Sequence, residues 1–167
     1  MGSNVVLRLV PTDDQIEKID RLLSVNTLLW NMLSSTYNNQ PTPKNYGIAL
    51  KDVQRRFIEM YGEHYMHVSM RDYTYSRFKR AVKELDRNDP NSKVPGRGND
   101  RRITSMLIPA YSGIVHMTHS DITLPGFIGS VHYRSEGHVP HGELKFFKLI
   151  RENTTRGIVY TLELLAA

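Results

Sequence analysis

The chain has 167 residues, with 22 Lys plus Arg, 17 Asp plus Glu, no Cys and 40% hydrophobic residues. This composition fits one ordinary globular domain or two small ones and argues against a disordered chain. Without cysteine there is no disulfide framework, no thiolate zinc site and no cysteine nucleophile, which favours a reducing compartment. No apolar run approaches the roughly 18 residues that a membrane span needs, and residues 1–10 lack the pattern of a signal peptide, so we expect a cytoplasmic protein.

The first elements are a strand and a helix. Alternating apolar side chains over residues 5–10, followed by Pro11, predict a short strand. Thr12 and Gln15 then have the spacing of a capping box, which predicts that a helix begins here and covers about residues 13–35. The apolar side of this helix is formed by Ile16, Ile19, Leu23, Trp30 and Leu33.

Two further amphipathic helices follow. The first ends near Tyr61, and its apolar stripe is Leu50, Val53, Phe57 and Met60. The second is capped by Ser69, with Asp72 at the third position. One side of this last helix carries Tyr75, Phe78, Val82 and Leu85, and the opposite side carries Arg77, Arg80, Lys83 and Arg87. An apolar side can pack while the basic side meets solvent or phosphate, and a plain solvated surface stays an alternative.

The remaining chain is first a loop and then strands. Residues 88–102 contain Pro and Gly turn signals and predict a mobile basic loop rather than a folded element. Short strands begin at Ile103, and residues 144–151 and 158–165 predict a closing hairpin. We therefore expect an α+β fold, in which a small antiparallel β-barrel (N-terminal strand plus C-terminal strands) is interrupted by a three-helix insertion. The barrel takes residues 1–11 and 103–167, and the insertion takes residues 12–102.

The positive charge is local. Residues 71–102 hold ten basic and five acidic residues, which accounts for the whole net charge of +5. Such an excess is typical of proteins that bind a polyanion, although a charge-rich helix and a polar loop also form ordinary surfaces. Tyr46 and Tyr111, placed in loops, are free to stack on unpaired bases, whereas the spacing of Tyr75 favours packing.

Catalytic and metal-binding patterns are weak. Three histidine pairs have the spacing i, i+3, namely His64 and His67, His116 and His119, and His138 and His141. This spacing brings side chains together only on a helix, and the first pair, the one outside the β-region, has no obvious third ligand. The carboxylates are scattered, and no catalytic triad, P-loop or dinucleotide motif is present. We expect no metal, no cofactor and no enzyme activity.

Several short motifs occur in a recognisable order. They are Arg8-Leu9-Val10-Pro11-Thr12 with Gln15, Leu29-Trp30-Asn31, Tyr46-Gly47, Ala81-Val82-Lys83-Glu84-Leu85, Leu124-Pro125-Gly126-Phe127-Ile128-Gly129 and the closing hairpin. Their order and spacing over nearly the whole chain resemble the N-terminal half of TnpB, a family of transposon-encoded, RNA-guided nucleases related to type V CRISPR effectors. The resemblance implies a wedge-type β-barrel interrupted by a helical recognition domain.

The resemblance also implies a function. In that family this half binds the guide RNA and the guide-target duplex and helps to read a short motif beside the DNA target. The catalytic carboxylates belong to a RuvC-like nuclease domain that would follow the closing hairpin, so no catalytic residue is assigned here. Tyr46 matches a tyrosine that can contact the target-adjacent duplex. Val68 and Asp72 stand where the family can place polar side chains against this duplex, which weakens the expectation of DNA-motif reading.

We predict a non-catalytic lobe that binds a structured guide-like RNA in the cytoplasm of a prokaryotic cell. Target DNA and a separate RuvC-like nuclease subunit or full-length effector are further candidate partners, and no membrane is expected. The expected nucleic-acid-binding residues are Tyr46, Arg77, Arg80, Lys83, Arg87, Lys93, Arg97, Arg101, Arg102 and Tyr111. The alternative is a phage or mobile-element protein that imitates this lobe and inhibits or partners a full-length nuclease. A third hypothesis is a fragment of a longer enzyme.

Overall fold

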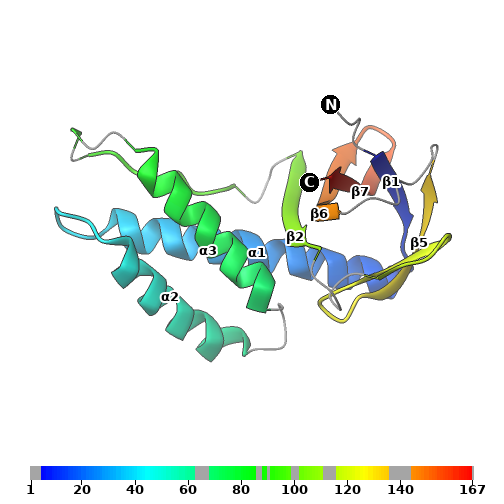
Figure 1. Cartoon of the computed structure of the whole chain (residues 1–167), viewed down its shortest axis with the longest axis horizontal. Helices are drawn as coiled ribbons and strands as arrows, with labels where there is room; N and C mark the ends of the chain where they lie inside the picture. The colour runs from blue at the N-terminus through cyan, green and yellow to red at the C-terminus, as the bar shows by residue number, and fades with distance from the viewer. Residues whose placement is uncertain are drawn as a thin grey trace. The chain divides into compact units, whose positions relative to one another are not determined.

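The computed structural model describes residues 5–62, 68–85, 88–89, 91–98, 102–110, 116–135 and 144–166. Its elements in chain order are β1 (Val5–Val10), α1 (Asp13–Asn38), α2 (Tyr46–Tyr61), α3 (Val68–Lys83), β2 (Ile103–Pro109), β3 (His116–Met117), β4 (Asp121–Leu124), β5 (Gly129–Ser135), β6 (Leu144–Thr154) and β7 (Gly157–Ala166). Three helices are thus inserted between the first strand and a set of antiparallel strands that curl into a half-barrel (Figure 1). The predicted α+β class is confirmed.

The seven strands form one sheet in the order β2-β6-β7-β1-β5-β4-β3. The N-terminal strand β1 lies between β7 and β5, antiparallel to both, as expected for a strand that completes a C-terminal sheet. The closing hairpin is longer than predicted, because the β6-β7 ladder continues to the pair Thr154 and Gly157. Gly157 has a φ of 123°, a conformation that side-chain-bearing residues rarely adopt, which explains glycine at this turn.

The chain divides into two compact units. The sheet unit comprises residues 1–23 and 100–167, and the helical unit comprises residues 24–99. The sequence placed the start of the insertion at residue 12, whereas the first part of α1 groups with the sheet.

No helix within the described ranges is both long and apolar enough to cross a membrane.

The start of α1 is bonded to the sheet by polar side chains. The predicted capping box is present, since the Thr12 N–H donates to Gln15 Oε1 at 3.0 Å and the Gln15 N–H donates to Thr12 Oγ1 at 3.2 Å. Gln15 Nε2 also donates to the carbonyl of Ser130 at 2.7 Å. Further along α1, Asp20 Oδ1 accepts from the Tyr160 hydroxyl at 2.7 Å. These bonds explain why this part of α1 belongs to the sheet unit.

Tyr160 gives this unit a measurable pH dependence. Burial and the hydrogen bond to Asp20 raise the pKa of Tyr160 above its ordinary value of 10.0. The unfolded chain therefore loses this proton first, so the stabilisation is complete below pH 10.0 and is lost as the pH rises through the higher folded pKa. We expect the melting temperature of the wild type, measured by circular dichroism, to fall more steeply above about pH 10 than the melting temperature of Tyr160→Phe. Identical profiles for Tyr160→Phe and the wild type would contradict the assignment.

The helical unit packs around aromatic side chains of α1 and α3. The rings of Trp30 and Tyr37 meet the Phe78 ring edge-on, with centroids 6.1 and 5.8 Å apart. Phe78 is fully buried, as predicted for the apolar side of α3. From α2, the buried residues are Ala49, Val53 and Phe57.

Three details of the predicted helices were wrong. Met60 was placed on the buried stripe of α2, but it lies in the last turn and is 62% exposed. Ser69 does not cap α3, because the helix already begins at Val68. The first helix was expected to end near residue 35, yet α1 continues to Asn38, because Asn38 is held in the helical unit by side-chain bonds.

Candidate nucleic-acid interface

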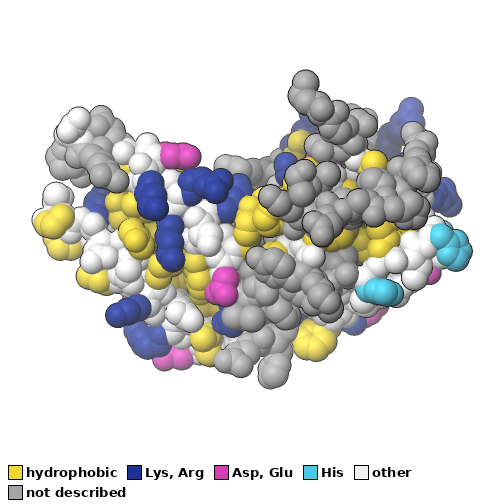
Figure 2. Space-filling view, viewed as in Figure 1, with side chains coloured by type: hydrophobic (Ala, Val, Ile, Leu, Met, Phe, Trp, Pro, Cys, Tyr) yellow, Lys and Arg dark blue, Asp and Glu magenta, His cyan; other side chains and the backbone are white. Residues whose placement is uncertain are grey.

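The basic side of α3 has the arrangement that the sequence predicted. Arg77, Arg80 and Lys83 are exposed, whereas Phe78 is fully buried. Figure 2 shows Lys and Arg side chains, in dark blue, gathered over this helix. Arg80 and Lys83 also lie in the last turn, where positive charge interacts favourably with the helix dipole. We call Arg77, Arg80 and Lys83 the α3 basic face.

One basic residue of α3 does not belong to this face. Arg71 is only 6% exposed, and its Nε and Nη1 atoms have no hydrogen-bond partner in the part of the chain that is described. Its neighbour one turn on, Tyr75, is 9% exposed. Burial raises the pKa of Tyr75, and the positive charge of Arg71 partly opposes this shift. Arg71 therefore contributes to the net charge but not to the exposed basic surface.

The basic segment 93–98 has no regular secondary structure, as predicted, but side chains of α1 hydrogen-bond to its backbone. Val94 is fully buried. Its N–H donates to Asn38 Oδ1 at 2.9 Å, and its carbonyl accepts from Asn38 Nδ2 at 2.8 Å and from the Ser34 hydroxyl at 2.6 Å. The side chains of α1 thus pair with the backbone of this segment as a neighbouring strand would.

A second asparagine of α1 repeats the pattern. The Arg97 N–H donates to Asn31 Oδ1 at 2.7 Å, and the Arg97 carbonyl accepts from Asn31 Nδ2 at 2.9 Å. Between these two anchors, the carbonyl of Pro95 accepts from the Trp30 indole N–H at 3.0 Å. Polar side chains of α1 thus supply the hydrogen-bond partners that a backbone without secondary structure lacks, a set of contacts that the sequence did not predict.

We call the hydrogen bonds from Trp30, Asn31, Ser34 and Asn38 to this segment the clamp. The clamp determines which basic side chains of the segment are exposed. The Arg97 guanidinium carbon lies 4.4 Å from the centroid of the Trp30 ring, close enough for a cation–π interaction. Arg97 is half-buried, whereas Lys93 is exposed. Lys93 is therefore open to a phosphate, while Arg97 is held against an aromatic ring.

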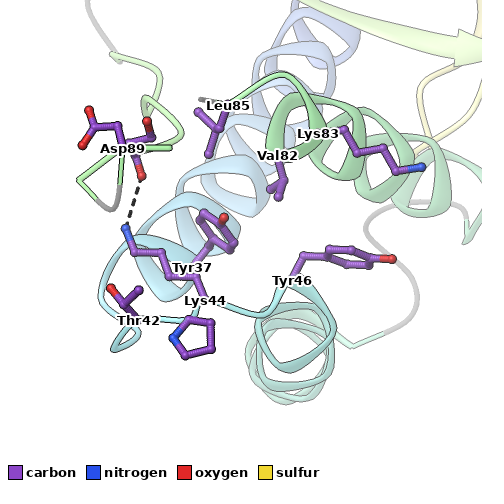
Figure 3. Close-up of a pocket in the computed structure, with 10 residues that line it drawn as sticks. Tyr37, Thr42, Lys44, Tyr46, Val82, Lys83, Leu85 and Asp89 are labelled. Atoms are coloured by element: carbon purple, nitrogen blue, oxygen red, sulfur yellow. Dashed lines mark hydrogen bonds between the residues drawn. The ribbon is translucent and has the colours of Figure 1, made fainter. Parts of the chain in front are cut away.

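A pocket of about 540 Å³ lies in the helical unit (Figure 3). Its lining includes Tyr37, Lys44, Tyr46, Lys83 and Ser92. Lys44 Nζ donates to the carbonyl of Ser92 at 3.3 Å, drawn as the dashed line in Figure 3, and lies 5.7 Å from the centroid of the Tyr37 ring. The pocket thus brings two predicted binding residues, Tyr46 and Lys83, to one cavity.

Tyr46 was predicted to lie in a loop, but it is the first residue of α2. The Asn45 side chain caps this helix by accepting the N–H of Gly47 at 2.7 Å. Tyr46 is 39% exposed, so part of its ring faces solvent. The sequence analysis missed Lys44. Its position directly before Asn45, the N-cap of α2, and two residues before Tyr46 is the signal that could have identified it.

Other predicted residues are not part of this arrangement. Arg102 belongs to the sheet unit, where it is 75% exposed and pairs with Glu152 at 3.4 Å. Arg87, Arg101 and Tyr111 lie outside the described residues, as do His64 and His67. Within the described ranges, no group of three or more His, Asp or Glu side chains could hold a metal ion.

Comparison with known proteins adds no identification. No family model matches this sequence, and no curated protein matches it either.

Proposed function

We propose that this chain is a nucleic-acid-binding lobe that holds a structured guide-type RNA. The observation that carries the proposal is the α3 basic face, where three cations are exposed on the side of the helix opposite to buried Phe78. Arginine and lysine bind phosphate oxygens through charge-assisted hydrogen bonds, which position a nucleic acid without reading its sequence. Because a rigid helix presents these cations, the cations keep a fixed spacing along an RNA backbone.

The pocket beside α3 supplies a place for an unpaired base. Tyr46 offers a partly exposed aromatic face, and base stacking on such a ring contributes about 1–3 kcal/mol per base. Lys83 belongs both to the pocket lining and to the α3 basic face, so a nucleotide can place its base in the pocket and its phosphate on α3. This geometry suits loops and bulges of structured RNA, whose bases are free to leave the stack.

The clamped segment supports the same function. Lys93 is exposed on a backbone that Asn31 and Asn38 hold in place, so binding does not have to order this segment. Preorganised cations lose less conformational entropy on binding than cations on a loose loop. The resemblance to the N-terminal half of TnpB agrees with this function and extends it to the RNA-DNA duplex of a TnpB-like or type V CRISPR-like system.

The proposal is tested by recovering the protein from its native host and sequencing the bound nucleic acid. One enriched structured RNA from the neighbouring locus is the expected result. If no specific RNA is enriched and a full-length RNA-guided nuclease is bound in stoichiometric amount, the chain is instead a partner or inhibitor of that nuclease, and the α3 basic face serves a protein interface.

A further inference from the structure

We infer that the sheet unit carries a second, separate anion site, which binds a nucleotide through its phosphate. In the register of β1 and β5, Arg8 lies directly opposite Arg134. Side chains at directly opposed positions of an antiparallel pair lie on the same side of the sheet, with Cβ atoms about 4.5–5.5 Å apart. Two guanidinium groups, neither of which can lose its proton, are thus placed side by side.

No described residue forms an ion pair with either arginine. Both are exposed, and within the described ranges neither forms a hydrogen bond or an ion pair. On the other side of Arg8 the ladder places Thr161, which is uncharged. His132 precedes Arg134 by two residues on the same face of β5. Its Nδ1 lies 3.5 Å from a carboxylate oxygen of Asp121 on the neighbouring strand β4. That carboxylate therefore faces His132 rather than the arginine pair, and Glu163, the carboxylate of β7 on the same face as Arg8, stands opposite Val6 and not opposite either arginine.

A cleft lies directly beside this pair. The ladder between β1 and β7 ends at the pair Arg8 and Thr161, and beyond it a cleft of about 320 Å³ opens between the two strands. Both arginines line it. Its other lining residues are Leu9, Val10, Pro11, Ile16, Ile158, Val159 and Tyr160. The arginines are the charged groups of a cleft whose walls are otherwise mainly apolar.

The chemistry of this lining selects the ligand class. Two guanidinium groups offer up to ten N–H donors, a number suited to the several oxygens of a phosphate. Val10 and Ile158 remain 40% and 49% exposed, so the apolar wall has surface to cover. A nucleotide fits both features, because its phosphate can bind the arginines while its nucleoside packs on the apolar wall. The volume is within the range of small-ligand pockets.

The test compares adenosine 5′-monophosphate with inorganic phosphate in thermal unfolding at equal concentration and ionic strength. We expect adenosine 5′-monophosphate to raise the wild-type melting temperature by about 3 °C near saturation and inorganic phosphate to raise it less. Arg8→Gln and Arg134→Gln should each abolish the rise. Arg156→Gln, at an exposed arginine of the β6-β7 turn, is the matched control and should keep the full rise.

A second readout separates a binding site from a merely structural pair. Without anions at low salt, Arg8→Gln and Arg134→Gln should melt at a higher temperature than the wild type, because each removes a like-charge contact across the strands. A variant that loses affinity by unfolding would show the opposite change. The inference is overturned if the nucleotide gives no shift, if the shift survives in both variants, or if phosphate and nucleotide act equally.

This site is independent of the proposed RNA function. It lies in the sheet unit, and Arg8 and Arg134 take no part in the α3 basic face. An Arg77→Glu/Arg80→Glu double variant should lose RNA binding and keep the thermal shift with adenosine 5′-monophosphate. Loss of the thermal shift would therefore overturn the nucleotide site without bearing on RNA binding, and absence of RNA binding would leave the nucleotide site standing.

Discussion

Asn38→Ala should lower the melting temperature by about 6 °C. The Asn38 amide both accepts from the N–H and donates to the carbonyl of Val94, which is fully buried. Alanine leaves that N–H without its partner, while the carbonyl keeps the Ser34 hydroxyl at 2.6 Å. An unsatisfied buried group of this kind costs about 2 kcal/mol, which corresponds to the expected shift for a domain of this size.

The neighbouring asparagine is the matched control. Asn39 is exposed, and its amide contacts only the Ser35 hydroxyl at 3.4 Å among the described residues. Asn39→Ala should therefore change the melting temperature by less than about 1 °C. Limited trypsin digestion followed by mass spectrometry gives a local readout, because cleavage after Lys93 should become faster in Asn38→Ala and not in Asn39→Ala. Equal behaviour of the two variants in both assays would contradict the clamp.

Arg77→Glu/Arg80→Glu should weaken the binding of a structured RNA by at least about 100-fold. A charge-assisted hydrogen bond contributes about 1.5–3 kcal/mol, so loss of two such contacts corresponds to two or more powers of ten in affinity. Because both residues are exposed opposite buried Phe78, the melting temperature should change by less than about 2 °C. Fluorescence anisotropy with a labelled RNA, alongside thermal unfolding, measures both quantities.

An equal change of charge on α2 controls for the overall field of the protein. Lys51 and Arg55 are exposed in the same helical unit, and Arg55 pairs with Asp52 at 3.0 Å and with Glu59 at 3.5 Å. Lys51→Glu/Arg55→Glu should weaken RNA binding by less than about fivefold, because only the long-range attraction falls. If the two double variants lose affinity equally, RNA binding depends on net charge rather than on the α3 basic face.

The parts of the fold that were predictable have local causes. Residues 5–10 form a strand and Thr12 with Gln15 caps α1 because alternation and capping are properties of adjacent residues. The exposure of Arg77 and Arg80 on α3 also follows from helical periodicity.

The parts that were missed depend on distant partners. Asn31 and Asn38 have the sequence signature of an ordinary polar helix surface, and nothing local shows that they bind a segment some sixty residues further on. The burial of Arg71 was missed for the same reason, because its charge predicts exposure. The Arg8 and Arg134 pair requires the register of two strands that are far apart in sequence.

The salt dependence of RNA affinity tests the central claim most directly. Anisotropy titrations from about 50 to about 300 mM KCl give the slope of the logarithm of the association constant against the logarithm of the salt concentration. This slope reports the number of phosphates neutralised. With Arg77, Arg80 and Lys83 on three phosphates, the expected slope is about −2 to −3, and Arg77→Glu/Arg80→Glu should be shallower by about 2 units. A wild-type slope near zero, or an unchanged slope in the variant, would contradict phosphate binding by the α3 basic face.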